Sequence, residues 1–337
     1  MTSDNLAKKS ELASLNNDLI VKSSKVASAN SNKKLACIRE GIPEELQTFL
    51  STFEIDGEFM SLEAYGSGHL HRTMRGEWQC GSKKVWYIHQ CLNTSIFKDV
   101  SALMNNIETA TSHLRKKLIE LESNNLVVLS IVHTQGGASY AQAIDGSCWR
   151  TYEFVTDTES YDCCLDIDHA REAALTFGHF NSLLSDLDPS LFHAVIPDFI
   201  DTPKRFISFR NAVERDPEGR VEAVQKEIDF AFAHEAEAGM IMEGLRSGTF
   251  PWRITHNDMK LNNLLFCRHT GRGKCVVDLD TVMPGSNLYD FGDLVRTASV
   301  QAPEDEKELS KVEMNIEYFK ALLQGFLHGI GDGLNRD

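Results

Sequence analysis

The sequence predicts an α+β protein with two lobes, in which a small antiparallel sheet is followed by a mainly helical part. Two observations support this fold class. From about residue 60 to 155, strand-like runs alternate with turns, one of them at Gly81-Ser82-Lys83-Lys84. Beyond about residue 165, apolar residues recur at helical spacing. Because the spacing of apolar residues changes from strand-like to helical near residue 165, we expect the sheet to precede the helices in the chain.

Individual elements follow from the same patterns. A helix is expected to interrupt the sheet over 99–121, where Val100, Leu103 and Ile107 begin a helical repeat. The further expected elements are strands over 126–132 and 148–155 and helices over 170–187, 221–245 and 312–326.

The composition changes along the chain in a way that suggests its organisation. Residues 1–35 are rich in Ser, Asn and Lys and contain no aromatic residue, which is typical of a disordered tail. We expect an N-lobe over 36–155 and a C-lobe over 156–337, with a hinge near Glu153 to Thr158. Small-molecule sites prefer such junctions between lobes.

Charge and hydropathy exclude several classes of function. The net charge of −15 argues against a nucleic-acid partner, since contacts with phosphate backbones need clustered Lys and Arg. The eight cysteines form no C-x-x-C pair, and no apolar run reaches the roughly 20 residues that span a bilayer. We therefore expect a soluble, cytoplasmic protein without a membrane partner; its oligomeric state is not predicted.

The segment from Trp252 to Arg296 concentrates polar residues around two short strand-like runs, 264–266 and 274–279. If the runs form an antiparallel hairpin, Asn263 at its entry lies close to Asp278 and Asp280 at its exit. Asp258 precedes this hairpin by one loop. Hard oxygen donors are thus expected to converge at one end of the hairpin.

Such a set of donors suits Mg²⁺, which prefers one or two carboxylates together with phosphate oxygens and water. Phosphoryl transfer also needs a carboxylate that orients the attacking hydroxyl and accepts its proton. The pattern is therefore consistent with a kinase that uses ATP and Mg²⁺, in which Asp258 handles the proton while Asn263 and Asp278 hold the metal. Turn chemistry is the alternative explanation, because Asn and Asp are common where strands end.

A glycine pair, Gly66-Ser67-Gly68, stands between two strand-like runs. Residues without a side chain let backbone N–H groups approach phosphates closely, so these three residues are candidates to cover the phosphates of ATP. An isolated Gly-x-Gly is also common in plain turns.

The spacing of the loop resembles a known pattern. His256-Asn257-Asp258, followed by Asn263 five positions after the aspartate, is similar to the catalytic loop of the aminoglycoside-phosphotransferase and protein-kinase-like superfamily. Six stretches between about 62 and 325 resemble the N-acetylhexosamine 1-kinase group, in the same order: GSGHLHRT, LNTSIFKD, WRTYEFVTDTESYD, IPDFIDTPKRF, HNDMKLNN and VVDLDTVMPGSNLYDFGD.

This resemblance implies a two-lobed protein-kinase-like fold and an ATP-dependent phosphotransferase with an alcohol group as acceptor. It implies a sugar or amino sugar as the partner, with the anomeric hydroxyl of an N-acetylhexosamine as the acceptor. Asp258 would be the catalytic base and contact the substrate, Asn263 and Asp278 the metal ligands, and Asp290 a buried support of the loop.

The resemblance also suggests roles for residues around this centre. His69 follows the glycine pair, where the related kinases carry a histidine near the sugar, and Glu153 and Val155 at the hinge are expected to bind the nucleotide. Lys260 is a candidate contact of the γ-phosphate, and His256 is either a brace of the loop or a catalytic group. Asp280 is expected to anchor neighbouring groups, as is Asp293 together with Asp290.

The chain departs from the relatives at three places. The third strand, His89-Gln90-Cys91, lacks the cation that usually meets the α- and β-phosphates, and Lys83, Lys84, Arg72 and Arg75 are candidate replacements. Ile200 stands where the relatives carry a histidine, and the chain ends at Asp337, before their final helical segment.

These departures leave two other interpretations open. One is a kinase for another small alcohol, such as choline, homoserine or an aminoglycoside. The other is a non-catalytic, nucleotide-binding pseudokinase.

Overall fold

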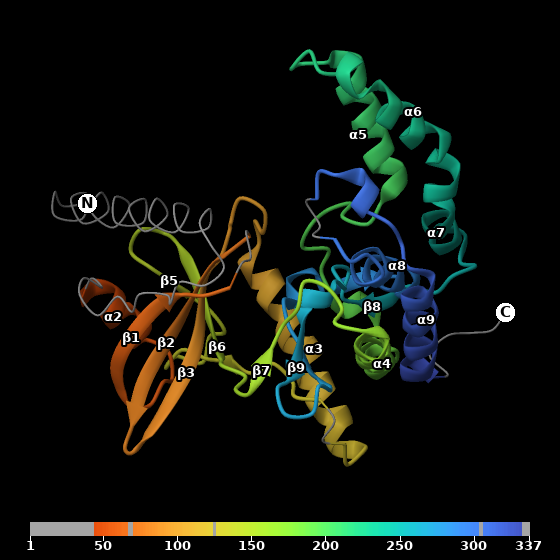
Figure 1. The fold of residues 1–337 in the computed structure, drawn as a ribbon. Helices are drawn as coiled ribbons and strands as arrows, with labels where there is room; N and C mark the ends of the chain where they lie inside the picture. The colour runs from red at the N-terminus through yellow and green to blue at the C-terminus, as the bar shows by residue number, and fades with distance from the viewer. Residues whose placement is uncertain (1–43, 67–69, 124–125, 303–305, 332–337) are drawn as a thin grey trace. The chain divides into compact units, whose positions relative to one another are not determined.

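The computed structural model describes residues 44–66, 70–123, 126–302 and 306–331. These residues belong to two compact units, which we call unit 1 (Met1–Met104 and Leu129–Thr156) and unit 2 (Asn105–Val128 and Asp157–Asp337) (Figure 1). The expected tail, 1–35, lies outside the described residues. Unit 1 carries an antiparallel sheet and unit 2 is mainly helical, which confirms the predicted fold class.

The sheet of unit 1 has the strand order β1-β2-β3-β6-β4, with β5 also paired to β6, and every pairing is antiparallel. A tight turn at Gly81, whose φ of 59° favours glycine, joins β2 to β3. The strands are β1 (Glu58–Ala64), β2 (Arg72–Cys80), β3 (Lys83–Cys91), β4 (Ile131–Val132), β5 (Ala141–Gln142) and β6 (Cys148–Glu153).

The expected strand over 126–132 is shorter in the structure, because only Ile131 and Val132 pair with β6. The reason is that the chain before them has another partner. The Val127 N–H donates to the carbonyl of Lys274 at 2.7 Å, and both residues belong to unit 2. The residues around Val127 therefore lie beside Lys274 rather than beside β6.

One face of the unit 1 sheet is covered by a hydrophobic cluster, to which helix α2 (Glu44–Leu50) contributes Leu50. We call this side the cluster face. The buried members of the cluster are Leu50, Phe53, Leu62, Met74, Trp78, Val132 and Trp149. Side chains alternate along a strand, so the intervening residues lie on the other side, which we call the second face.

Helix α3 (Val100–Glu120) forms where the sequence predicts a helix over 99–121. The Asp99 carboxylate accepts a hydrogen bond from the Ala102 N–H at 2.9 Å and so caps its first turn. Leu103, Ile107 and Leu114 are buried along one side of the helix, which explains the apolar period in the sequence. The helix passes from unit 1 into unit 2 after Met104.

Unit 2 is built around two long helices, α4 and α9, that lie side by side (Figure 1). Glycines make this approach possible, because a Cβ at Gly329 would lie 2.1 Å from the Leu175 carbonyl oxygen. The helices of unit 2 are α4 (Ile167–Leu184), α5 (Thr202–Arg215), α6 (Gln225–Ala233), α7 (Glu235–Ser247), α8 (Asn287–Ala298) and α9 (Ile316–Ile330), with 3₁₀ turns at Pro189–Leu191, Glu222–Val224, Leu261–Asn263, Leu279–Thr281 and Leu309–Lys311.

Five short strands of unit 2 hold the segment that the sequence singles out. Two of them form the expected antiparallel hairpin, in which Val276 lies opposite Leu264. The sheets are β10-β9-β7 and β11-β8, with β7 (Thr158–Glu159), β8 (Arg253–Thr255), β9 (Leu264–Cys267), β10 (Gly273–Val276) and β11 (Met283–Gly285).

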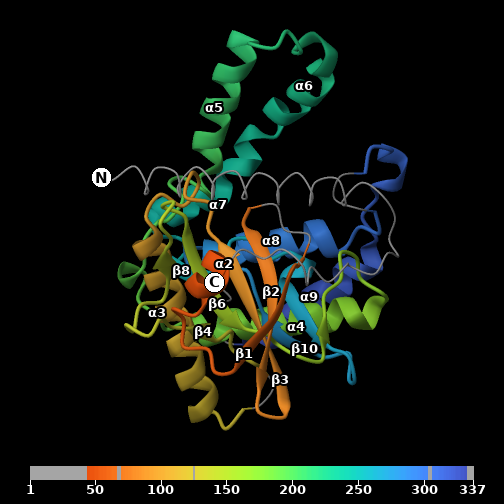
Figure 2. The ribbon, with the colours of Figure 1, turned by 90° about the vertical axis from the view of Figure 1, so that its left-hand side faces the viewer.

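The prediction of one helix over 221–245 was wrong in detail, since α6 ends and α7 begins at His234. Helix α5 was not predicted, although Phe206, Phe209 and Val213 recur there at helical spacing. None of its residues is buried, and α5 and α6 project from the rest of unit 2 (Figures 1 and 2).

None of the helices in the described part of the chain is long and apolar enough to cross a membrane.

Candidate active site

The loop that follows β8 is fixed by one buried carboxylate. Asp290, on α8, is 0% exposed and accepts hydrogen bonds from the backbone N–H groups of His256 (2.9 Å) and Asn257 (2.7 Å). Burial raises the pKa of the Asp290 carboxyl to about 6, although these two donors act in the opposite direction. Asp290 therefore sets the course of the backbone immediately before Asp258.

Asn257 holds the loop from the other side. It adopts a left-handed conformation (φ 61°), which Asn tolerates better than most residues. Its amide nitrogen donates to the carbonyl oxygens of Thr255, Thr281 and Met283 at 3.0 to 3.2 Å. A Cβ on Gly285 would lie 2.2 Å from the Asn257 Oδ1, so only glycine fits on the facing strand.

His256 is fully buried within the same loop. Its Nε2 lies 2.9 Å from the carbonyl oxygen of Val277, and a carbonyl only accepts hydrogen bonds, so Nε2 carries the proton. Its backbone carbonyl accepts a hydrogen bond from the Thr281 hydroxyl at 2.6 Å. His256 thus ties the loop to the segment that contains Asp278.

Asp258 has two polar neighbours from its own loop. The Asn263 Nδ2 donates to the Asp258 Oδ2 at 3.2 Å and to its backbone carbonyl at 2.8 Å. The Lys260 Nζ lies 3.4 Å from the same Oδ2. The structure therefore brings together three residues that the sequence places in one site, and Oδ1 is the carboxylate oxygen on which neither neighbour acts.

Asp278 and Asp280 follow the second strand of the hairpin. The Val277 N–H donates to the Asn263 carbonyl at 2.9 Å, which places Asp278 one residue beyond this pairing. Asp278 has a φ of 58°, in the left-handed region that Asn and Asp adopt more often than other non-glycine residues. Asp278 is partly exposed, whereas Asp280 is buried, as expected of an anchoring residue.

The donor set suits a magnesium ion held by few protein groups. Because the Asn263 nitrogen is engaged by Asp258, its Oδ1 is the atom left to face a cation, and Asp278 offers a hard carboxylate. Within the described ranges, no three His, Cys, Asp or Glu side chains gather as a metal cluster.

Asp293 differs from its expected role. It was expected to hold backbone groups beside Asp290, but its carboxylate accepts from the Arg296 side chain, at 2.9 Å from Nε and 2.8 Å from Nη2. Burial is the main cause that raises the pKa of Asp293, and the negative charge of Asp258 acts in the same direction. Sequence reasoning missed this pair because the spacing of 293 and 296 marks only two neighbours on a helix.

The expected nucleotide-binding residues belong to unit 1. Gly66 lies two residues after the end of β1 and has a φ of 79°, a conformation that suits glycine, while Ser67, Gly68 and His69 lie outside the described residues. Glu153 ends strand β6 and is exposed, and its N–H donates to the Ser130 carbonyl at 3.0 Å. Val155 follows two residues later and is partly buried.

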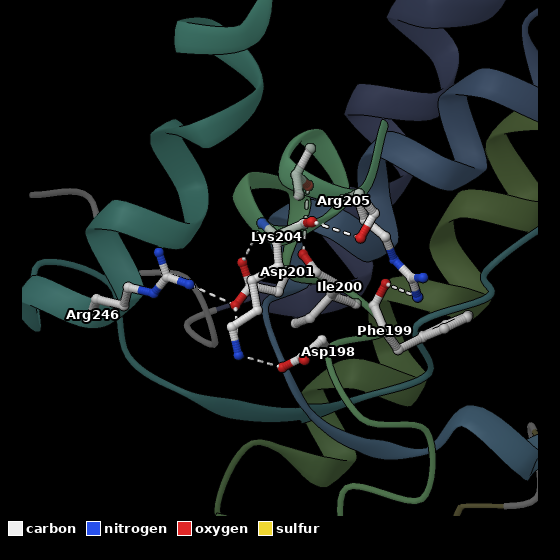
Figure 3. A network of polar contacts seen from close by, with 9 residues as sticks. Asp198, Phe199, Ile200, Asp201, Lys204, Arg205 and Arg246 are labelled. Carbon is white, nitrogen blue, oxygen red and sulfur yellow. Dashed lines mark hydrogen bonds and ion pairs between the residues drawn. The ribbon is translucent and has the colours of Figure 1, made fainter. Parts of the chain in front are cut away.

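A polar network surrounds Ile200 (Figure 3). Asp201 caps the N-terminus of α5, and its Oδ2 accepts a hydrogen bond from the Arg246 Nη2 of α7 at 2.5 Å. Lys204 Nζ donates to Asp198 at 2.6 Å, and Arg205 donates to the Phe199 carbonyl at 3.4 Å. The network joins the start of α5 to α7 and so holds the segment before α5 in place.

The antiparallel sheet followed by helices defines a protein-kinase-like fold, and the loop after β8 carries Asp258 and Asn263 side by side. Comparison with known proteins identifies the family, because residues 113–324, well over half of the chain, match the model of the phosphotransferase enzyme family. The chain belongs to this family. It is accordingly an ATP-dependent phosphotransferase with an alcohol group as acceptor.

Solved structures with low sequence identity share the fold. A spectinomycin phosphotransferase, solved with ADP and spectinomycin, is 14% identical with a TM-score of 0.53, over 88% of this chain and 82% of that one. An aminoglycoside phosphotransferase from Alicyclobacillus acidocaldarius is 14% identical with a TM-score of 0.54, over 91% and 82%. An ethanolamine kinase from Plasmodium vivax is 13% identical with a TM-score of 0.50, over 88% and 72%.

Proposed function

We propose that the protein transfers the γ-phosphate of ATP to a sugar hydroxyl, and that the acceptor is the anomeric hydroxyl of an N-acetylhexosamine. The observation that carries the proposal is the Asp258 carboxylate, held by Asn263 beside Lys260 on a loop anchored to buried Asp290. Phosphoryl transfer depends on positioning and on charge stabilisation, which such a fixed carboxylate supplies.

Asp258 acts on the acceptor hydroxyl. Its Oδ2 is engaged by Asn263 and Lys260, so Oδ1 orients the hydroxyl and takes its proton as the new oxygen–phosphorus bond forms. The bond between the γ-phosphorus and its bridging oxygen breaks, and ADP leaves with the electron pair. The proton then passes from Asp258 to solvent.

Asn263 and Asp278 are the residues that would hold Mg²⁺, with Asp280 as a buried anchor beside them. Bound there, the ion supplies positive charge to the phosphate oxygens. Lys260, whose ammonium lies near Asp258, is assigned to the γ-phosphate.

We assign His256 to the bracing role rather than to proton transfer. Its ring is fully buried and its protonated nitrogen is committed to the Val277 carbonyl. Gly66, Ser67 and Gly68 are assigned to the phosphates of ATP, Glu153 and Val155 to the rest of the nucleotide, and His69 to the sugar.

The choice of acceptor rests on the motifs that resemble N-acetylhexosamine 1-kinases. Ile200 favours a second candidate, a kinase for another small alcohol such as choline, homoserine or an aminoglycoside, because isoleucine cannot give a sugar the hydrogen bond that histidine gives. The two candidates share the same chemistry at Asp258 and differ only in the acceptor.

The test is ADP release from Mg·ATP with N-acetylglucosamine, N-acetylgalactosamine and a panel of small alcohols. We expect hexosamine-dependent turnover in the native protein and a fall in kcat of about 10²–10⁴-fold in Asp258→Asn. The matched control is Asp168→Asn on α4, whose side chain is 88% exposed, and it should keep full activity.

Turnover with choline, homoserine or an aminoglycoside alone would move the assignment to the second candidate. Undiminished turnover in Asp258→Asn would overturn the role of this carboxylate, whichever acceptor is used.

A further inference from the structure

We propose that His89, on strand β3, makes unit 1 sensitive to acid, because protonation of its buried ring opens the sheet. This switch is separate from Asp258, Asn263 and Asp278, which belong to unit 2, and it does not depend on the identity of the acceptor. It depends on one titratable ring that is enclosed by apolar side chains.

The strand register places His89 on the cluster face in the middle of the sheet. Strand β3 has β2 on one side and β6 on the other, and His89 lies directly opposite Met74 and Thr151. Directly paired residues of antiparallel strands share one face of a sheet. Because Met74 is a buried member of the hydrophobic cluster, the His89 ring lies on the same face, and it is 0% exposed.

The two ring nitrogens of His89 have different surroundings. Nδ1 lies 2.9 Å from the Thr151 hydroxyl, whereas Nε2 is buried and has no hydrogen-bond partner in the part of the chain that the structure describes. A neutral ring can direct its one N–H to Thr151 and leave Nε2 without a proton. In a protonated ring both nitrogens are donors, so Nε2 would carry a buried N–H and a share of the charge without an acceptor.

Apolar groups of β2 enclose the Nε2 side of the ring. The centroid of the Trp78 ring lies 5.1 Å from that of His89. A Cβ at Gly76 would lie 3.1 Å from the His89 Nε2 and 2.1 Å from the Trp78 ring, so Gly76 and Trp78 both lie next to this nitrogen. The face of Trp78 would attract a protonated ring, but this attraction replaces only part of the hydration that the charge loses on burial.

The charged groups on the cluster face do not change this conclusion. Arg72 of β2 and Glu153 of β6 lie on this face, each two residues along its strand from the direct partner of His89. The other titratable groups on this face of β3 are Tyr87 and Cys91, while β1 and α2 contribute apolar side chains to the cluster. Burial is the cause that lowers the pKa of His89 to about 3.

The direction of the effect follows from the pKa values of the two states. In the unfolded chain the pKa of His89 is near 6.5, so below this pH the unfolded state binds the proton more tightly than the folded state does. The stability of unit 1 is therefore full above about pH 6.5 and decreases about tenfold in the folding equilibrium constant for each pH unit towards 3. Asp290 of unit 2 has a raised pKa and thus the opposite dependence, so acid should open unit 1 first.

The test is hydrogen exchange of the full chain at pH 7.5 and pH 4.5, resolved by peptide and corrected for the intrinsic exchange rates. We expect the equilibrium constant for opening of β2, β3 and β6 to rise about 100-fold between these two pH values. The corresponding constants of α4 and α9 in unit 2 should stay within about threefold.

Two variants replace the ring of His89 by a neutral side chain. In His89→Gln an amide can still reach the Thr151 hydroxyl, and in His89→Leu the side chain is apolar like the cluster around it, so one variant serves if the other folds poorly. In each variant the rise should shrink to less than about threefold, because nothing titrates at this position. The matched control is His269→Gln between β9 and β10, whose side chain is 77% exposed, and it should keep the full 100-fold rise of the native protein.

A rise in His89→Gln or His89→Leu as large as that of the native protein would overturn the inference. So would a rise in α4 and α9 equal to that in the strands, because the acid response would then belong to the whole chain rather than to unit 1. Neither result affects the proposed function, which is tested by turnover at neutral pH.

Discussion

Asp290 fixes the backbone of the loop before Asp258, but the burial of its charge lowers the unfolding free energy at neutral pH. Its ionised carboxylate accepts hydrogen bonds from two backbone N–H groups. Its burial disfavours the negative charge and raises the pKa of the carboxyl to about 6. The folded state therefore binds the proton more tightly than the unfolded state, whose pKa is near 3.8. The stability that comes from this proton is full below about pH 4 and is lost as the pH rises through about 6.

The first prediction uses this dependence. Between pH 4 and pH 7, the unfolding free energy of the native protein should fall relative to that of Asp290→Asn by about 2 kcal/mol, because the amide does not titrate. Urea unfolding of both proteins at the two pH values measures the difference. A constant difference across this range would contradict the raised pKa.

The residues that we propose for catalysis and metal binding could be singled out from the sequence because their spacing is local. Asp258, Asn263 and Asp278 flank one hairpin, whose turn residues and alternation can be read from the chain. The contact between Gln90 and Arg150 could not be predicted in this way, because it depends on the pairing of strands whose residues are 60 positions apart in the chain. No local pattern reports that register.

Among the elements, the pairing of α4 and α9 depends most strongly on residues without side chains. Cβ atoms at Gly178 and Gly325 would lie 2.5 Å from the Phe326 carbonyl oxygen and 2.3 Å from that of Arg171, respectively. The backbones of the two helices therefore meet directly, and neither helix can move aside without opening the core of unit 2.

The prediction at this scale is that Gly329→Ala lowers the unfolding free energy by about 1–3 kcal/mol, since its new methyl group would overlap the Leu175 carbonyl. The matched control is Gly292→Ala on α8. That glycine is exposed with nothing within 4 Å of an added Cβ, so the change should be neutral or stabilising. Thermal unfolding compares the two, and equal effects would show that the helices are not in such close contact.

The elements that sequence reasoning found are those with a buried stripe, such as α3, α4 and α9. The apolar period of these helices results from packing, so the sequence reports it directly. Helix α5 has no buried stripe, and its sequence signals are the Asp201 cap, Pro203 in its first turn and the spacing of Phe206 and Phe209. Figure 3 shows one contact that joins the start of α5 to α7, between Asp201 and Arg246, and this contact is not local.

The whole molecule carries a net charge of −15 and must bind a nucleotide that is itself an anion. Long-range electrostatics oppose this binding, so local cations and the metal have to provide the attraction. Ligand binding in turn stabilises the folded state, by about 2.7 kcal/mol at a ligand concentration 100 times the dissociation constant.

The last prediction measures the metal through this stabilisation. Mg·ATP should raise the melting temperature of the native protein more than ATP with a chelator does, because the ion relieves the repulsion between phosphates and carboxylates. In Asp278→Asn the two melting temperatures should coincide. If Mg²⁺ still adds stability in this variant, the ion is held elsewhere.

The contact between α4 and α9 also has a consequence during synthesis on the ribosome. Residues 185–315 separate the two helices, so the apolar side of α4 emerges long before its partner exists. At typical rates of translation the delay is on the order of ten seconds, which is long compared with helix formation. We expect nascent chains arrested before residue 316 to be cleaved by protease within α4 and to bind chaperones, and chains extended past Ile330 to resist both.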